Sequence, residues 1–194
     1  MPRQLLDNVY RMSNTELIGL AKNRFVPCDL QLAVAKTDYR RAHLYLCENT
    51  GLSIKTRDYL WSDECNSGYS LKATMLACGQ YSENPEKYVE FYDRYEQTMW
   101  SRSPWRMGHA LFGHYYYRTE NTTGTPTKLL HRVYDQRLKP ELEKCTLHGY
   151  YPQYYLERLA RHPNVDLNLA IKLSQSGVDK VQRIGFERIV ELSK

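Results

Sequence analysis

The sequence predicts an all-α protein, a single domain over residues 1–194, built as a short α-solenoid of stacked helical hairpins. The chain contains nearly the same phrase twice, DLQLAV at 29–34 and DLNLAI at 166–171, each shortly after a proline. Such an echo is typical of repeat architectures. No segment alternates apolar and polar residues in the way of a strand, so we expect little or no sheet. The apolar spacing predicts helices of about 8–15 residues, which are too short to stand alone in water and must stack. A globular helical bundle is the alternative.

The first third of the chain reads as a series of short helices. A helix is predicted over 13–23, with Ser13 and Asn14 as possible caps, and a second over 28–36, capped by Asp29. Asp38 can cap a third helix, which ends at 49–51. Residues 52–61 and 70–78 continue the helical pattern, with a polar turn at 63–68 between them and Gly79 as a stop signal.

The middle of the chain interrupts this rhythm. Pro85 fits the first position of a helix that runs to about residue 99. Residues 100–126 then read as an irregular aromatic and basic insertion, in which 105–118 can form one helix between two loops. Thr127 caps the next helix, short helices follow at 140–145 and 154–161, and the second copy of the phrase at 165–175 leads into a last helix from residue 179.

The two copies of the phrase also carry a family resemblance. The segment from His162 to Leu173, followed by Val178 to Arg183, resembles HEAT-like and leucine-rich-variant repeats, in which a helix after a Pro-containing turn leads through an Asp turn into a second helix. Residues 27–49 are similar, whereas 52–99 and 127–161 fit only as degenerate units. The resemblance implies an α-solenoid, a fold that usually presents a binding surface. The size, irregular repeats and tyrosine excess also resemble small accessory proteins of tailed phages, which inhibit or redirect a host complex.

Composition narrows the class of function. The chain has 17 Tyr against 4 Phe, and Tyr is the aromatic residue that tolerates a half-wet position. A net charge of +5 is only mildly basic and falls short of a dedicated nucleic-acid binder. The N-terminus shows no secretory signal, no stretch is long and apolar enough to span a membrane, and the five scattered Cys fit reduced thiols. We therefore expect a cytoplasmic protein, in the host cytoplasm if it is phage-encoded.

The candidate binding residues lie mainly in the interruption. Residues 97–134 carry five basic residues and one acid, set among seven large aromatic side chains. Aromatic and arginine side chains dominate protein interfaces, and the same mixture can hold phosphates while rings stack on bases. A second cluster of tyrosines suggests a Tyr-lined groove, although packing between adjacent repeats is the better explanation for any single Tyr. The candidate partner-binding residues are Trp100, Arg102, Trp105, Arg106, Tyr115, Tyr116, Tyr117, Arg118, Tyr154 and Tyr155.

Little in the sequence favours catalysis or metal binding. The Cys145–His148 pair has no matching second pair, and His109 and His114 are five residues apart, so we expect no metal site. There is no nucleophile elbow, Walker loop or dinucleotide fingerprint, and nothing places Cys65 or Cys78 beside a partner. We expect no catalytic residues and no cofactor.

The resemblance adds one enzymatic alternative. HEAT-like DNA glycosylases bind DNA on a basic concave surface, and Trp100, Arg102, Trp105 and Arg106 could imitate its DNA-facing part. The nearest acids, at positions 63, 93 and 135, lack a matching context for the catalytic aspartate. We therefore expect a non-enzymatic adapter or inhibitor that binds a protein, with nucleic-acid binding, self-association or a structural role in a larger assembly as alternatives.

Overall fold

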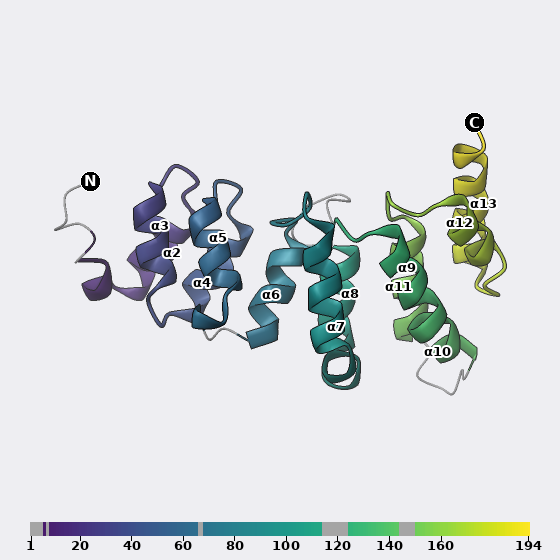
Figure 1. The fold of residues 1–194 in the computed structure, drawn as a ribbon, viewed down its shortest axis with the longest axis horizontal. Helices are drawn as coiled ribbons and strands as arrows, with labels where there is room; N and C mark the ends of the chain where they lie inside the picture. The colour runs from purple at the N-terminus through teal and green to yellow at the C-terminus, as the bar shows by residue number, and fades with distance from the viewer. Residues whose placement is uncertain (1–5, 7, 66–67, 114–123, 144–149) are drawn as a thin grey trace.

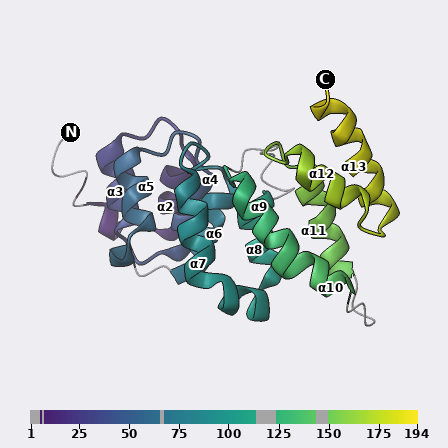
Figure 2. The same ribbon diagram turned by 45° about the vertical axis from the view of Figure 1, so that its right-hand side comes forward.

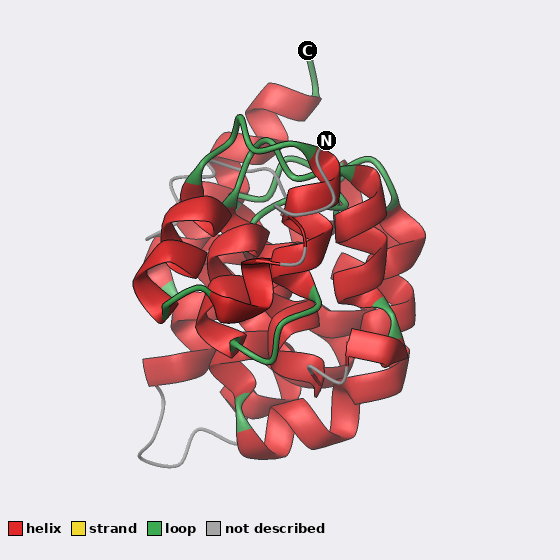
Figure 3. Ribbon diagram, turned by 90° about the vertical axis from the view of Figure 1, so that its left-hand side faces the viewer, coloured by secondary structure: helices red, strands yellow, loops and turns green. Residues whose placement is uncertain are grey.

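A computed structural model describes the chain except for residues 1–5, 7, 66–67, 114–123 and 144–149. Every regular element in the described residues is helical, and those residues contain no strand (Figure 3). The all-α prediction is therefore confirmed. No helix in the described part of the chain is long and apolar enough to cross a membrane.

The helices alternate between two rows along the long axis of the molecule (Figure 1). The first row packs in the order α2 (Asn14–Lys22), α4 (Arg40–Glu48), α6 (Gly68–Ala77), α8 (Pro104–Phe112), α11 (Tyr150–Ala160) and α13 (Asp179–Leu192). The second row contains α3 (Cys28–Ala35), α5 (Ile54–Trp61), α7 (Pro85–Arg102), α9 (Thr127–Val133) and α12 (Leu167–Ser174). Shorter elements are η1 (Val9–Arg11), η2 (Asp63–Cys65), the π-helical turn η4 (Tyr134–Leu138) and α10 (Lys139–Glu143). Contacts pass from neighbour to neighbour, as in a repeat stack.

The core lies between the two rows. Its largest fully buried side chains include Tyr88 and Tyr92 of α7 alongside Leu46, Leu71 and Met107 of the first row. The Tyr88 hydroxyl donates to the Leu76 carbonyl at 3.2 Å, and the Tyr92 hydroxyl donates to Glu96 at 3.1 Å. Part of the tyrosine excess therefore serves packing, because each buried ring keeps a partner for its polar end.

One turn recurs where the chain passes from the first row to the second. The side chains of Asn23 and Asn49 accept a hydrogen bond from the backbone N–H two residues later, at 3.0 and 2.8 Å. The ring Nδ1 of His162 accepts from the Asn164 N–H in the same way at 3.1 Å. In each case the N-cap of the next helix lies four residues after the turn side chain, at Pro27, Ser53 and Asp166. These turns are structurally equivalent although their sequences differ.

The two copies of the repeated phrase are displaced from structural equivalence by two residues. The caps Pro27 and Asp166, Lys36 and Gln175, and Tyr39 and Val178 are each 139 residues apart. The matching letters, Asp29 and Asp166, are 137 residues apart. Burial follows the first spacing: positions 30, 31, 34 and 35 are buried in α3, and 169, 170, 173 and 174 in α12. Equivalent positions of the two hairpins are therefore 139 residues apart, whereas the similar sequences are aligned at 137 residues, two residues out of register.

Several predicted helix ends are confirmed and others are wrong. Ser13 caps α2 through a full capping box with Glu16, and Pro85 is the first residue of α7. The predicted caps Asp29, Asp38 and Thr127 are wrong, since the N-cap positions are Pro27, Tyr39 and Pro126. In these cases the preceding loop sets where the chain turns, and no side-chain cap is formed.

The helix predicted over 105–118 ends early. Gly113 has a φ of 77°, which favours glycine and terminates α8 at Phe112. α8 is an integral member of the first row, packed between α6 and α11. Residues 100–102 and 104–112 of the 100–126 segment are thus helical and lie within the stack, whereas 124–126 form a loop before α9.

Candidate functional site

Trp105 and Arg106 lie in the first turn of α8 and form an aromatic and cationic pair, in which Trp105 is exposed and Arg106 is half-buried. The Trp105 side chain is 43% exposed, and the Arg106 guanidinium lies 4.7 Å from the centre of its ring. The His109 ring meets the Trp105 ring edge-on, with centroids 5.6 Å apart. Arg106 also donates a hydrogen bond to the Ser70 hydroxyl on α6. A large ring is thereby held at the surface with a cation fixed over it.

The neighbouring candidates Trp100 and Arg102 lie in the last turn of α7. Arg102 is exposed, whereas Trp100 is half-buried and packs edge-on against Tyr155 with ring centroids 6.3 Å apart. Trp100 therefore contributes partly to the core, and Arg102 is the accessible member of the pair.

Tyr155 is buried, which corrects its prediction as a partner-binding residue. It is 2% exposed, and its ring packs directly on Gly108 of α8, where an added Cβ would lie 2.2 Å from the Tyr155 Cε1. The close approach of α8 and α11 at this glycine leaves no surface for a partner to contact. Tyr155 is a packing residue between two helices of the first row.

Tyr154 remains accessible on the same helix. It is 38% exposed, and the Arg158 guanidinium lies 5.2 Å from its ring centre while also donating to the Gly113 carbonyl. Of the two tyrosine side chains of this cluster that the structure describes, Tyr154 is exposed and Tyr155 is buried, and Arg158 joins the exposed ring. The candidates Tyr115, Tyr116, Tyr117 and Arg118 lie outside the described residues.

A groove of about 370 Å³ runs between α4, α6 and α8, beside the Trp105–Arg106 pair. These helices are consecutive neighbours in the first row (Figure 2). The lining residues are Arg40, Leu44, Ser70, Ala73, Thr74, Ala77, Trp105, Arg106 and His109. Six of these nine lie far from the 100–126 segment in sequence, so the sequence analysis missed them. The spacing of Ser70, Ala73, Thr74 and Ala77 marks one stripe of small residues on a helix, and it is the only signal that could have suggested the groove.

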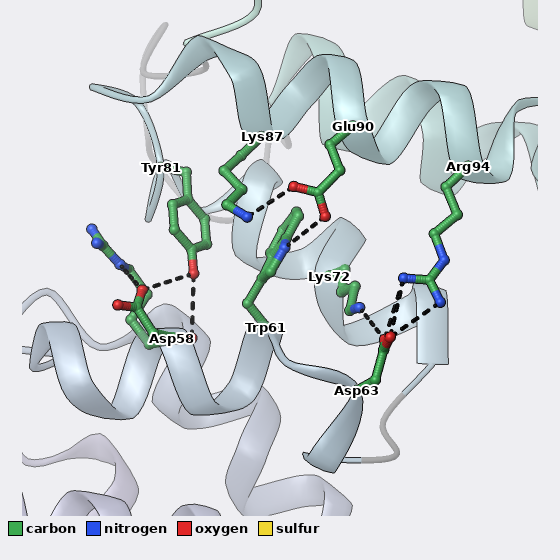
Figure 4. Close-up of polar contacts among 9 residues, drawn as sticks. Asp58, Trp61, Asp63, Lys72, Tyr81, Lys87, Glu90 and Arg94 are labelled. Atoms are coloured by element: carbon green, nitrogen blue, oxygen red, sulfur yellow. Dashed lines mark hydrogen bonds and ion pairs between the residues drawn. The ribbon is translucent and has the colours of Figure 1, made fainter.

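A second cluster, on α5, η2, α6 and α7, is held together by its own charges (Figure 4). Asp63 accepts from Lys72 at 3.0 Å and pairs with Arg94 at 3.3 Å. The hydrogen bonds from Lys72 and Arg94 keep the pKa of Asp63 below its usual value. Trp61 donates to Glu90 at 3.3 Å, and Glu90 also pairs with a lysine at 2.8 Å. Each described charge here has a partner, so the cluster is best explained as a seam that joins neighbouring helices.

Two of the described thiols, Cys47 and Cys78, are poorly suited to nucleophilic chemistry. Burial raises the pKa of Cys78 to about 12, and it raises the pKa of Cys47 well above the usual value. A thiol must ionise to act as a nucleophile or metal ligand. Within the described residues no three His, Cys, Asp or Glu side chains gather as metal ligands. His114 and the Cys145–His148 pair lie outside those residues.

Comparisons of the chain with protein-family models, with curated proteins and with solved structures found no match. The features of the chain that bear on function are therefore the groove and the exposed Trp105 ring beside it.

Proposed function

We propose that the protein is a non-enzymatic adapter or inhibitor that binds a protein partner through the first row of its helical stack. The observation that carries this proposal is the Trp105–Arg106 pair beside the groove between α4, α6 and α8. Tryptophan and arginine are the residues most enriched where binding energy concentrates in protein interfaces. A stack of hairpins supplies the extended rigid surface on which such residues work.

The arrangement of charge supports a protein partner over nucleic acid. In the second row, Arg94, Arg132 and Lys172 are each paired with an acid, at 3.3, 2.5 and 2.7 Å. These pairs neutralise much of the basic charge that phosphates would need. Binding through desolvated aromatic anchors tolerates salt, whereas phosphate binding weakens steeply as salt rises.

The test is quantitative affinity capture from lysate of the cells in which the protein is naturally made. The variant Trp105→Ala/Arg106→Ala is compared with wild type and with Arg24→Ala/Phe25→Ala. The control pair is matched, because Phe25 is 78% exposed and the Arg24 guanidinium lies 4.7 Å from its ring centre. It lies on a loop between α2 and α3, away from the groove.

We expect wild type and control to capture the same protein, resistant to nuclease and only modestly weakened by raised salt, and the Trp105/Arg106 variant to lose it. The control should melt within about 2 °C of wild type, since exposed substitutions rarely change stability by more than about 0.5 kcal/mol. The Trp105/Arg106 variant should melt within about 5 °C of wild type, since it also loses the bond to Ser70, worth about 1 kcal/mol. Equal capture by all three proteins contradicts the proposal. Capture that disappears with nuclease favours nucleic-acid binding, and a much lower melting temperature for the Trp105/Arg106 variant alone shows that the pair is part of the core.

A further inference from the structure

The groove between α4, α6 and α8 combines a small-residue floor with two basic walls. Ala73 and Ala77 of α6 form the floor and are buried. Arg40 comes from the first turn of α4, and Arg106 comes from the first turn of α8 on the other side of α6. The walls also carry Leu44, one turn after Arg40. The groove is therefore shaped for a narrow insert with both an anionic and an apolar contact.

Among the residues that the structure describes, no carboxylate lines this groove. Its ionisable lining residues are two arginines and one histidine. Neither Arg40 nor Arg106 forms an ion pair with an acid of the described residues. On the second row, by contrast, Arg94 and Arg132 are bonded to acids. Electrostatic complementarity therefore favours a negatively charged occupant at this place on the molecule.

One of the two guanidinium groups is already held in position. Arg106 donates to the Ser70 hydroxyl and lies over the Trp105 ring, so two contacts fix its plane. A guanidinium has five N–H donors in a planar fork, and the donors that Ser70 does not use can bind both oxygens of a carboxylate. A group fixed before binding loses less conformational entropy when the ligand arrives.

We infer that this groove binds an Asp or Glu side chain of an extended segment of the partner, with an adjacent apolar side chain packed between Leu44 and Trp105. The inference rests on the proposed function and names the chemistry that the partner must present. A groove of about 370 Å³ holds a few side chains. A nucleic-acid strand would instead need a longer basic track with stacking rings along it.

A random peptide display library panned against purified protein provides the first test. The baits are wild type, Arg40→Gln, Arg106→Gln and the control Arg24→Gln, which removes a guanidinium that also lies over a ring. We expect wild type and the control to enrich peptides with Asp or Glu next to an apolar residue. Arg40→Gln and Arg106→Gln should fail to enrich them.

The second test measures one enriched peptide directly. Its binding is followed through the indole N–H signal of Trp105, and it is compared with an analogue in which the acid is replaced by the corresponding amide. Because hydrogen bonds to charged groups are the strong ones, the amide analogue should bind at least about tenfold more weakly. Raised salt should weaken the acidic peptide more than its analogue.

Three results overturn the inference. They are enrichment by wild type of peptides without an acid, enrichment of acidic peptides by the Arg40→Gln and Arg106→Gln baits to the same extent as by wild type, and no enrichment by any bait. Displacement of the peptide by single-stranded oligothymidylate, with the same dependence on Arg40 and Arg106, identifies a phosphate site instead. If the Trp105/Arg106 variant still loses its captured protein while acidic peptides are not selected, this inference fails and the proposed function stands. If that variant captures as wild type does, the proposed function fails.

Discussion

Gly185 should be one of the least replaceable residues in the C-terminal hairpin. It is buried in the middle of α13, where an added Cβ would lie 2.6 Å from the Ser174 backbone nitrogen and 3.0 Å from the Ala170 carbonyl oxygen. These are backbone atoms of α12, so no side chain can rotate away. The glycine lets the two helices approach this closely, and a methyl group there must push them apart.

We expect Gly185→Ala to destabilise the protein although alanine is the better helix former. Overpacking a tight contact costs about 1–3 kcal/mol, while replacing a helical glycine by alanine returns up to about 1 kcal/mol. Three contacts with backbone place the cost in the upper part of that range, so the net loss is about 1–2 kcal/mol. In a chain of this length that lowers the melting temperature by roughly 2–8 °C.

The matched control is Gly19→Ala in α2, where nothing lies within 4 Å of the added Cβ. There only the gain in helix propensity remains, so this variant should be more stable by about 0.5–1 kcal/mol. Thermal and urea denaturation measure both variants. Hydrogen exchange of α12 and α13 detects local opening, because repeat stacks can unfold in parts. A Gly185→Ala protein as stable as wild type, with unchanged exchange in α12, would refute the reasoning.

Two further predictions concern pH. Asp166→Ala removes the acceptor for the Leu169 N–H at 2.8 Å and for His131 at 2.9 Å, and should cost about 1 kcal/mol in urea denaturation at pH 7. Partial burial raises the pKa of Asp166, but these hydrogen bonds outweigh it and keep the pKa below its usual value. The cost of the substitution should therefore vanish as acid protonates the carboxylate. A difference in stability that persists at pH 2 contradicts this. Burial lowers the pKa of His43, so the unfolded chain takes up a proton at higher pH than the folded chain does, and stability should fall as pH drops below about 6.5. The His43→Gln variant should show a smaller fall in stability between pH 7 and 5. An unchanged dependence of stability on pH in that variant contradicts this role of His43.

Only one side of the candidate site could be predicted from the sequence. The aromatic and basic composition of residues 97–134 pointed to Trp105 and Arg106, which the structure places at the surface beside a groove. The other wall, with Arg40 and Leu44, could not be found in this way, since it is brought to α8 only by the packing of α4 against α6 and α6 against α8. Tyr155 shows the converse error. Tyrosine is a residue type common in interfaces, but because Gly108 has no side chain, the Tyr155 ring packs against it in the core.

The repeated phrase shows most clearly where sequence stops and tertiary structure begins. Apolar spacing and the absence of strand patterns were enough to determine an all-α chain of short helices, because those signals are local. The phrase predicted a repeated unit at both ends of the chain, and the helix caps there recur at a constant spacing of 139 residues. It gave the wrong register, since Asp29 lies within the first turn of α3 whereas Asp166 is the cap of α12. Register depends on which residues are buried against the neighbouring helices and on where the preceding turn ends. Those are properties of the packed stack, so a match of letters cannot supply them.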